Sequence, residues 1–149
     1  MPDETLQLTI DKFTFRFPRA LRYNEAGVWL RIEGQRARLG ISDFVQQKSG
    51  DITFATVVPV GTPLSPDAEV GTIETVKANV SISSPVRGTV VEVNGRLEYE
   101  AELINQDPYG QGWLAVIECS DWELDGAALL DAEEYLAAVR QQAEAELAQ

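Results

Sequence analysis

Histidine is absent from the 149-residue sequence, and cysteine and methionine occur only once each. Without histidine the chain cannot use Ser-His or Cys-His catalysis, and it cannot build a histidine-based zinc site. Carboxylate pairs carry no signal in a chain with 24 acidic residues. We therefore expect a protein that is not an enzyme with its own active site.

The single cysteine, Cys119, cannot form a disulfide within the chain, which favours the cytoplasm. Its neighbours Glu118, Ser120 and Asp121 offer no positive charge to activate a thiol, so we interpret Cys119 as a semi-buried hydrophobic residue. The opening "MPDETLQLTI" lacks the basic region and apolar run of a secretory signal. No apolar run approaches membrane-spanning length.

Positive charge is also scarce, with 12 lysines and arginines against 24 acidic residues and a formal net charge of −12. Nucleic-acid binding depends on basic side chains that displace counterions from phosphates. An acidic surface suits soluble protein partners with basic faces. We expect no nucleic-acid partner, no membrane partner and a monomer.

Apolar residues alternate with polar ones along much of the chain, which is typical of half-buried strands. Phe13, Phe15 and Phe17 alternate before Pro18, and "GVWLRIEGQRARLGI" predicts two strands around Gly34. The Asn94-Gly95 pair predicts a tight hairpin, and residues 107–110 predict a turn. Trp29 and Trp113 lie within these patterns, so we assign both to the core.

Two segments have helical signals. Ser42 or Asp43 can cap a short helix that stops at Gly50, and Asp131 with Glu134 resembles a capping box that starts a helix over about 131–147. Many short strands with one terminal helix predict a small, mainly β sandwich or barrel decorated by helices. The length fits one domain over residues 1–149 with a single hydrophobic core.

Lys77 is one of only three lysines, with Lys12 and Lys48. Two apolar-alternating runs meet around it, so antiparallel pairing would place Lys77 at a hairpin tip, where an ordinary solubilising lysine would also fit. Residues 74–78, "ETVKA", are similar to the lipoyl attachment motif. A biotinyl carrier would flank its lysine with methionines, but the only methionine here is Met1.

Other segments extend this likeness in the same order along roughly residues 20 to 140: "LGISDFVQ" (39–46), "GDI" (50–52), "SPVRGTVVEVN" (84–94), "LINQDPYGQGWL" (103–114) and "LLDAEEYL" (129–136). Together they resemble the H protein family of the glycine cleavage system.

The resemblance implies a hybrid barrel-sandwich lipoyl domain with short helices, a C-terminal α-helix and lipoate in amide linkage to Lys77. It also implies that Glu74 helps a lipoylating enzyme to recognise the site. The implied partners are that enzyme, a glycine decarboxylase that uses pyridoxal phosphate, a tetrahydrofolate-dependent aminomethyltransferase and a dihydrolipoyl dehydrogenase. The protein would be their non-catalytic carrier.

The sequence departs from the family pattern at two acidic positions. The family's His-Glu-Trp string reads Gly27-Val28-Trp29 here, and Ser81 stands where an aspartate is usual. A cationic aminomethyl cargo would favour carboxylates beside its resting place, and Glu25 or another acid could supply one from a neighbouring position.

Three other functions stay open on the sequence. The cargo could instead be sulfane sulfur, because H-like lipoate-binding proteins also serve heterodisulfide-reductase-like complexes and dithiols exchange sulfur readily. The chain could also be an unmodified interaction module, or, third, a self-contained enzyme. Whether the arm has a resting cleft is not decided by the sequence.

Overall fold

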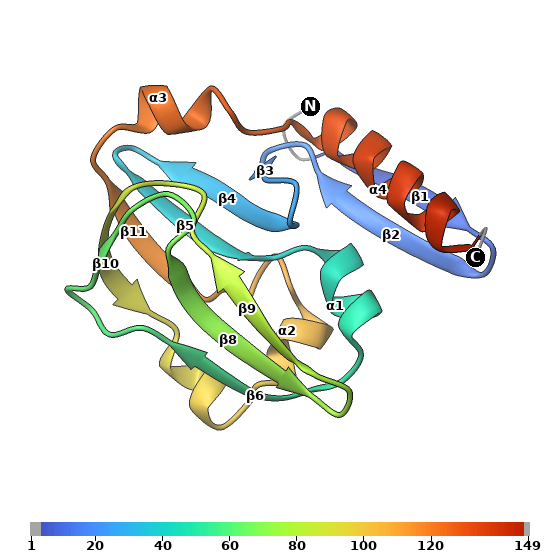
Figure 1. Cartoon of the computed structure of the whole chain (residues 1–149), viewed down its shortest axis with the longest axis horizontal. Helices are drawn as coiled ribbons and strands as arrows, with labels where there is room; N and C mark the ends of the chain where they lie inside the picture. The colour runs from blue at the N-terminus through green and yellow to red at the C-terminus, as the bar shows by residue number, and fades with distance from the viewer. Residues whose placement is uncertain (1–3, 148–149) are drawn as a thin grey trace.

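The computed structural model describes residues 4–147. They form a sandwich of two sheets and, beside it, a strand hairpin that packs against the C-terminal helix (Figure 1). The strands are β1 (Thr5–Ile10), β2 (Phe13–Pro18), β3 (Arg22–Tyr23), β4 (Val28–Glu33), β5 (Arg36–Ile41), β6 (Ile52–Val57), β7 (Pro63–Leu64), β8 (Glu69–Thr75), β9 (Asn79–Ser83), β10 (Gly88–Val93) and β11 (Ala115–Cys119). The helices are α1 (Asp43–Ser49), a 3-10 turn η1 (Gly95–Glu98), α2 (Leu103–Gln106), α3 (Trp122–Gly126) and α4 (Ala132–Leu147).

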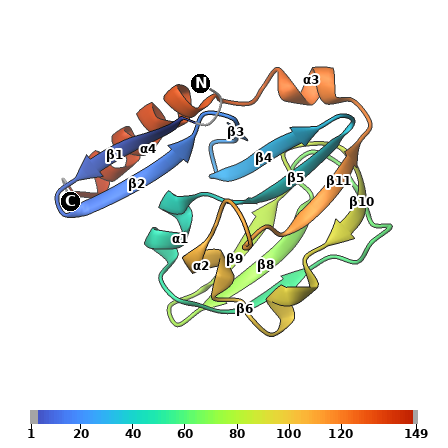
Figure 2. The same ribbon diagram turned by 180° about the vertical axis from the view of Figure 1, so that it is seen from behind.

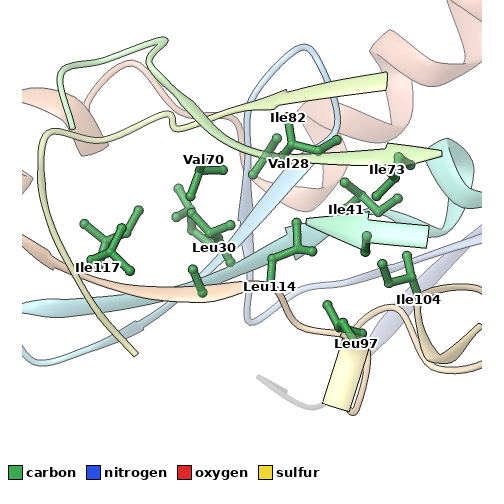
Figure 3. Packing of buried hydrophobic residues seen from close by; sticks show 14 of the residues in the cluster. Val28, Leu30, Ile41, Val70, Ile73, Ile82, Leu97, Ile104, Leu114 and Ile117 are labelled. Atoms are coloured by element: carbon green, nitrogen blue, oxygen red, sulfur yellow. The ribbon is translucent and has the colours of Figure 1, made fainter. Parts of the chain in front are cut away.

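The larger part is a sandwich of two antiparallel sheets. One has six strands in the order β3-β4-β5-β11-β10-β7, and the other has three in the order β6-β8-β9. Apolar side chains from the facing sides of both sheets fill the space between them (Figure 3). The mainly β fold with short helices and a C-terminal helix, expected from the sequence, is therefore confirmed.

The predicted hairpin around Gly34 is confirmed as β4–β5, with Glu33 paired to Arg36. Gly34 has a positive φ of 69°, which an L-residue adopts only with strain. The short helix is confirmed as α1, whose N-cap Ser42 accepts a hydrogen bond from the Val45 N–H. The turn at residues 107–110 is also confirmed, because the Gly110 N–H donates to the Asp107 carbonyl.

The hairpin predicted at Asn94-Gly95 is wrong. Asn94 instead caps η1, accepting from the Arg96 N–H, and its amide donates to the carbonyls of Gln111 and Trp113, both at 2.8 Å. These long-range partners hold the side chain, so the chain turns into a helical segment. The strand expected from Trp113 to Ile117 begins two residues later, at Ala115.

The first strand, β1, is not among the predicted elements. It pairs with β2 in a hairpin of its own, and α4 packs along this hairpin (Figure 2). Leu8, Phe15, Phe17, Trp29 and Tyr135 lie in the buried cluster that forms there, separate from the sandwich core. The expectation of one hydrophobic core is thus replaced by two adjoining clusters.

The capping box predicted for the C-terminal helix is confirmed. The Glu134 N–H donates to Asp131 Oδ1 at 2.8 Å, and the Asp131 N–H donates to Glu134 Oε1 at 3.0 Å. Tyr135 and Val139 are buried as their spacing predicts. Their face of α4 packs on the hairpin and on β3, at the edge of the six-stranded sheet.

No helix in residues 4–147 is long and apolar enough to cross a membrane.

Candidate functional site

Lys77 lies at the tip of the β8–β9 hairpin. Glu74 pairs with Asn79, and the Thr75 N–H donates to the Ala78 carbonyl at 2.9 Å, which leaves Val76 and Lys77 as the loop. Buried Val70, Ile73 and Ile82 anchor the two strands in the sandwich core. The tip is therefore an extension of a packed sheet.

The side chain of Thr75 fixes the shape of this tip. Its hydroxyl accepts from the N–H groups of Lys77 at 3.3 Å and Ala78 at 3.2 Å, and it donates to the Ala78 carbonyl at 3.1 Å. Local side-chain bonds of this kind stabilise a tight turn. Threonine, which stands where the family usually has serine, supplies the same hydroxyl.

The ammonium of Lys77 is exposed, and among the described residues it forms no ion pair. Lys48, by contrast, is bound to Glu146 at 2.6 Å. Lys12 offers a closer comparison, because it also lies in a hairpin loop, after Asp11 at the tip of β1–β2. The two loops differ in that only Lys77 follows a glutamate by three residues.

Glu74 is exposed on β8, three residues before Lys77, where it pairs across the sheet with Phe54 of β6. Phe54 keeps 48% of its surface exposed. An acid and an aromatic ring thus lie side by side near the lysine, a combination that a recognising protein can bind.

A cavity of about 390 Å³ opens beside Lys77. Four segments that are far apart in the sequence line it: the turn before β4, α1, the β8–β9 tip and α4. The lining residues are Glu25, Ala26, Phe44, Val45, Lys48, Ser49, Thr75, Lys77, Ala78, Val80, Tyr135 and Gln142.

Among residues 4–147, Glu25 is the only carboxylate that lines this cavity. Neither of the positions noted as lacking an acid lies there. Val28 is buried in the sandwich core, near Ile82 in Figure 3, and the Ser81 hydroxyl donates to Glu69 at 2.6 Å on the outside of the sheet. Of the acids considered from the sequence, Glu25 is the one that shares a cavity with Lys77.

Tyr135 forms part of the cavity wall, and a buried hydrogen bond fixes the position of its hydroxyl. Its hydroxyl and that of Ser42 form a buried hydrogen bond of 2.7 Å. Burial raises the pKa of Tyr135 to about 12, although the Ser42 bond opposes the shift, so the phenol stays neutral at physiological pH. Tyr135 therefore contributes no charge to the cavity wall.

Close packing around Gly27 explains why the histidine of the family pattern is missing at this position. A Cβ at this position would lie 2.7 Å from the Tyr135 hydroxyl and 2.3 Å from Val45 Cγ2. Its φ is also positive, at 87°. Any side chain at residue 27 would therefore displace the side chain of Val45 on α1 or that of Tyr135 on α4.

The other candidate residues lie away from Lys77. Trp29 is fully buried, as expected, and donates to the Pro108 carbonyl at 2.9 Å. Trp113 is only half-buried, with the Arg38 guanidinium 4.5 Å above its ring. Cys119 is half-buried, and burial, followed by the charge of Asp125, raises its pKa to about 11. An inert thiol is the result.

Sequence reasoning missed the contributions of Phe44, Lys48 and Tyr135 to the cavity. Each had a local explanation, since Phe44 and Lys48 belong to an amphipathic helix and Tyr135 to the apolar stripe of α4. No spacing in the sequence indicates that these two helices meet beside Lys77. Among residues 4–147 no cluster of metal-ligating side chains was found.

Comparison with known proteins gives one consistent result. A family model described as "Glycine cleavage H-protein" matches residues 21–142. The glycine cleavage system H protein of Brevibacillus brevis is 45% identical over 126 residues, covering 84% of this chain and 98% of the relative. That of Bacteroides thetaiotaomicron is 42% identical over 123 residues, covering 83% and 97%.

A solved structure agrees. The crystal structure of a glycine cleavage system H protein from Mycobacterium marinum superposes with a TM-score of 0.72 at 28% identity, covering 81% of this chain and 97% of that one. The architecture expected from the resemblance, a barrel-sandwich lipoyl fold, is thus confirmed.

Proposed function

The chain belongs to the glycine cleavage H-protein family, and from this membership we propose that Lys77 bears a lipoyl group in amide linkage. The protein is then a non-catalytic lipoyl carrier, which moves an aminomethyl group and reducing equivalents between partner enzymes. The observation that carries the proposal is an exposed lysine, without an ion-pair partner among the described residues, on a hydrogen-bonded hairpin tip beside a cavity. Residues 1–149 act as one lipoyl domain, which works in the cytoplasm.

Lys77 fits the attachment for a physical reason. Its ammonium is free to react, and amide formation removes the charge, so nothing in the fold loses an ion-pair partner. A lipoyl group supplies a disulfide that is reduced to two thiols, one of which can carry the cargo. The hairpin restrains one end of the arm and so keeps the other at high effective concentration near a docked enzyme.

The partners proposed are a glycine decarboxylase, an aminomethyltransferase and a dihydrolipoyl dehydrogenase, with a lipoylating enzyme acting earlier. Glu74 is proposed as a recognition element for that enzyme, supported by its exposed position three residues before Lys77. The chain offers an internal control for this role, because Lys12 lies in a similar loop without the glutamate.

Attachment is tested by intact mass and peptide mapping after co-expression with a lipoylating enzyme. We expect one lipoyl increment, on the peptide that contains Lys77, and none on Lys12 or Lys48. Lys77→Arg should lose the increment while keeping its thermal stability, and Glu74→Gln should reduce the yield. An unmodified Lys77 would overturn the carrier proposal and leave an interaction module.

Glu25 is proposed to face the cargo, since it is the carboxylate that lines the cavity beside Lys77. An aminomethyl group is cationic when protonated, so a nearby carboxylate would favour its retention. Sulfane sulfur, the alternative cargo for a heterodisulfide-reductase-like complex, carries no such cation. The cavity therefore favours the aminomethyl cargo.

The cargo is tested with the lipoylated protein, glycine decarboxylase and labelled glycine. We expect Glu25→Gln to retain label about two- to fivefold less well, the range typical of an exposed charge pair. Glu69→Gln is the matched control, because Glu69 contacts Ser81 outside the cavity. Equal retention in both variants would exclude the role of Glu25. Failure of the wild-type protein to load would exclude glycine as the source and favour sulfur.

A further inference from the structure

A second cavity, of about 220 Å³, adjoins the one beside Lys77. Its apolar lining comes from Ile10, Phe13 and Phe15 of the β1–β2 hairpin and from Ala143 of α4. Phe44 and Lys48 of α1 line both cavities, so the two share a wall. We name this second cavity the hairpin groove.

The hairpin groove is an addition to the family core. The family model begins at residue 21, whereas the hairpin spans Thr5–Pro18. Phe17 packs edge-on against Tyr135 at 5.3 Å, and the Arg16 N–H donates to Asp43 at 2.9 Å, so the hairpin is bound to both α4 and α1. The groove between them is therefore a built part of this fold.

We propose that the hairpin groove receives the dithiolane end of the arm on Lys77 while the arm carries no cargo. The inference rests on the proposed function, because it requires a lipoyl group at that lysine. The occupant is thus a group carried by the chain itself, and its attachment point opens on the adjoining cavity.

The length of the arm is comparable to the distance from Lys77 to the wall that the two cavities share. A Cβ placed on Gly50, just after α1, would lie 3.8 Å from Lys77 Cε, so the lysine side chain passes the C-terminal end of that helix. Phe44 lies six residues before Gly50, which corresponds to about 9 Å along the axis of an α-helix. An extended chain covers roughly 1.2 Å per bond, so the bonds from Cε to the first ring sulfur span about 10 Å. Figure 1 shows α1 lying between the β8–β9 tip and the β1–β2 hairpin.

The groove also matches the ring chemically. Apolar and aromatic side chains suit a ring of carbon and sulfur, because sulfur makes favourable contacts with aromatic edges. The charges at its rim are already paired, since Lys48 binds Glu146 at 2.6 Å. A neutral group can therefore enter without stripping a free charge of water.

The test is the rate at which a water-soluble phosphine reduces the lipoyl disulfide of the holoprotein. The phosphine cleaves the sulfur–sulfur bond and becomes its oxide by taking oxygen from water, which leaves two thiols. Quenching with iodoacetamide and measuring the mass of the Lys77 peptide counts the reduced fraction. A docked ring is shielded, so reduction reports the undocked population.

Phe13→Ser is the informative variant, and Phe54→Ser is its control, because both phenylalanines are 48% exposed. Phe54 lies beside Glu74 but outside both cavities. We expect reduction to be about fivefold faster in Phe13→Ser, the ratio set by losing roughly 1 kcal/mol of apolar contact. Phe54→Ser should reduce at the wild-type rate. Thermal unfolding checks that both variants keep the fold.

The outcomes separate the two proposals. If Lys77 is not lipoylated, the carrier function fails, and the groove inference fails with it. If Lys77 is lipoylated but Phe13→Ser reduces as slowly as wild type, the groove inference alone is wrong. Equal acceleration in both variants would also overturn it, because the ring would then be making non-specific contact with exposed aromatic residues.

Discussion

Replacing Gly27 by alanine should destabilise the protein strongly, for two separable reasons. The positive φ of 87° costs an L-residue about 1–2 kcal/mol, part of which is offset by the lower entropy of the unfolded chain. The new Cβ would also lie 2.7 Å from the Tyr135 hydroxyl, and overpacking of this kind costs about 1–3 kcal/mol. Disturbing the buried Ser42–Tyr135 bond adds about 1 kcal/mol. We expect a total near 4 kcal/mol.

Gly34 supplies the matched control. Its φ is 69°, but a Cβ there would meet nothing within 4 Å. Gly34→Ala should therefore show only the conformational cost, about 1 kcal/mol. The difference between the two variants, about 3 kcal/mol, isolates the packing of α4 against α1. Urea unfolding of both variants gives the two free energies, with the slope checked for two-state behaviour.

A double variant sharpens the test. Adding Tyr135→Phe to Gly27→Ala removes the hydroxyl that the new Cβ approaches, so the second change should cost less there than it does alone. If Gly27→Ala and Gly34→Ala differ by less than about 0.5 kcal/mol, within the usual scatter of additivity, then the contact with Tyr135 carries no stability. The explanation given for the missing histidine would be wrong.

Three further predictions concern residues away from the arm. Partial burial raises the pKa of Asp125, but hydrogen bonds from Arg87 outweigh this effect and lower the pKa below its usual 3.8. Asp125→Asn, which loses the charge that Arg87 binds, should therefore cost about 2 kcal/mol at neutral pH. The stability from this carboxylate is present above pH 3.8 and is lost as the pH falls through the lowered value, so urea unfolding should show the gap closing in acid. Cys119, with its pKa near 11, should react with iodoacetamide at pH 8 roughly a hundredfold more slowly than an ordinary thiol of pKa 9.0, and an ordinary rate would refute its burial. Asn94→Ala should cost about 2–3 kcal/mol in thermal unfolding, because two backbone carbonyls lose their 2.8 Å donors, and an unchanged melting temperature would exclude that role.

Local patterns predicted the parts of the fold that local chemistry determines. Gly34, Ser42 and the Asp131–Glu134 pair each act on backbone groups within four residues, and each element they predict is present. Asn94 shows where such reasoning fails. Its amide is held by carbonyls 17 and 19 residues away, and these bonds override the hairpin tendency of an Asn-Gly pair.

The β1 strand was missed for a different reason. Leu6, Leu8 and Ile10 alternate with polar residues, so the signal was present in the sequence. The apolar side of β1 is covered by α4, which lies more than 120 residues later in the chain. The alternation alone did not distinguish this strand from a polar terminus, because the helix that covers it is so distant in the sequence.

The candidate site divides in the same way. The tip position of Lys77 follows from the alternation of Val70, Ile73, Val80 and Ile82, so the sequence alone could predict it. The cavity does not follow, because its walls come from four separate segments. The sequence named Glu25 as an acid that could replace the carboxylates missing at Val28 and Ser81. It did not indicate that Glu25 lies beside Lys77.

Strand β4 contributes residues to both buried clusters. Val28 points into the sandwich core, and its neighbour Trp29 lies in the second cluster, because successive strand residues face opposite sides. The first cluster holds the hairpin that bears Lys77, whereas the second holds α4 and the β1–β2 hairpin against α1. If Lys77 bears the proposed arm, changes in Tyr135 or Phe17 should alter how the arm rests without altering whether it is attached, because both residues lie in the second cluster and neither lies at the β8–β9 tip. Under the two proposals, attachment of the arm depends on the β8–β9 tip, and its shelter depends on the second cluster, to which the β1–β2 hairpin belongs.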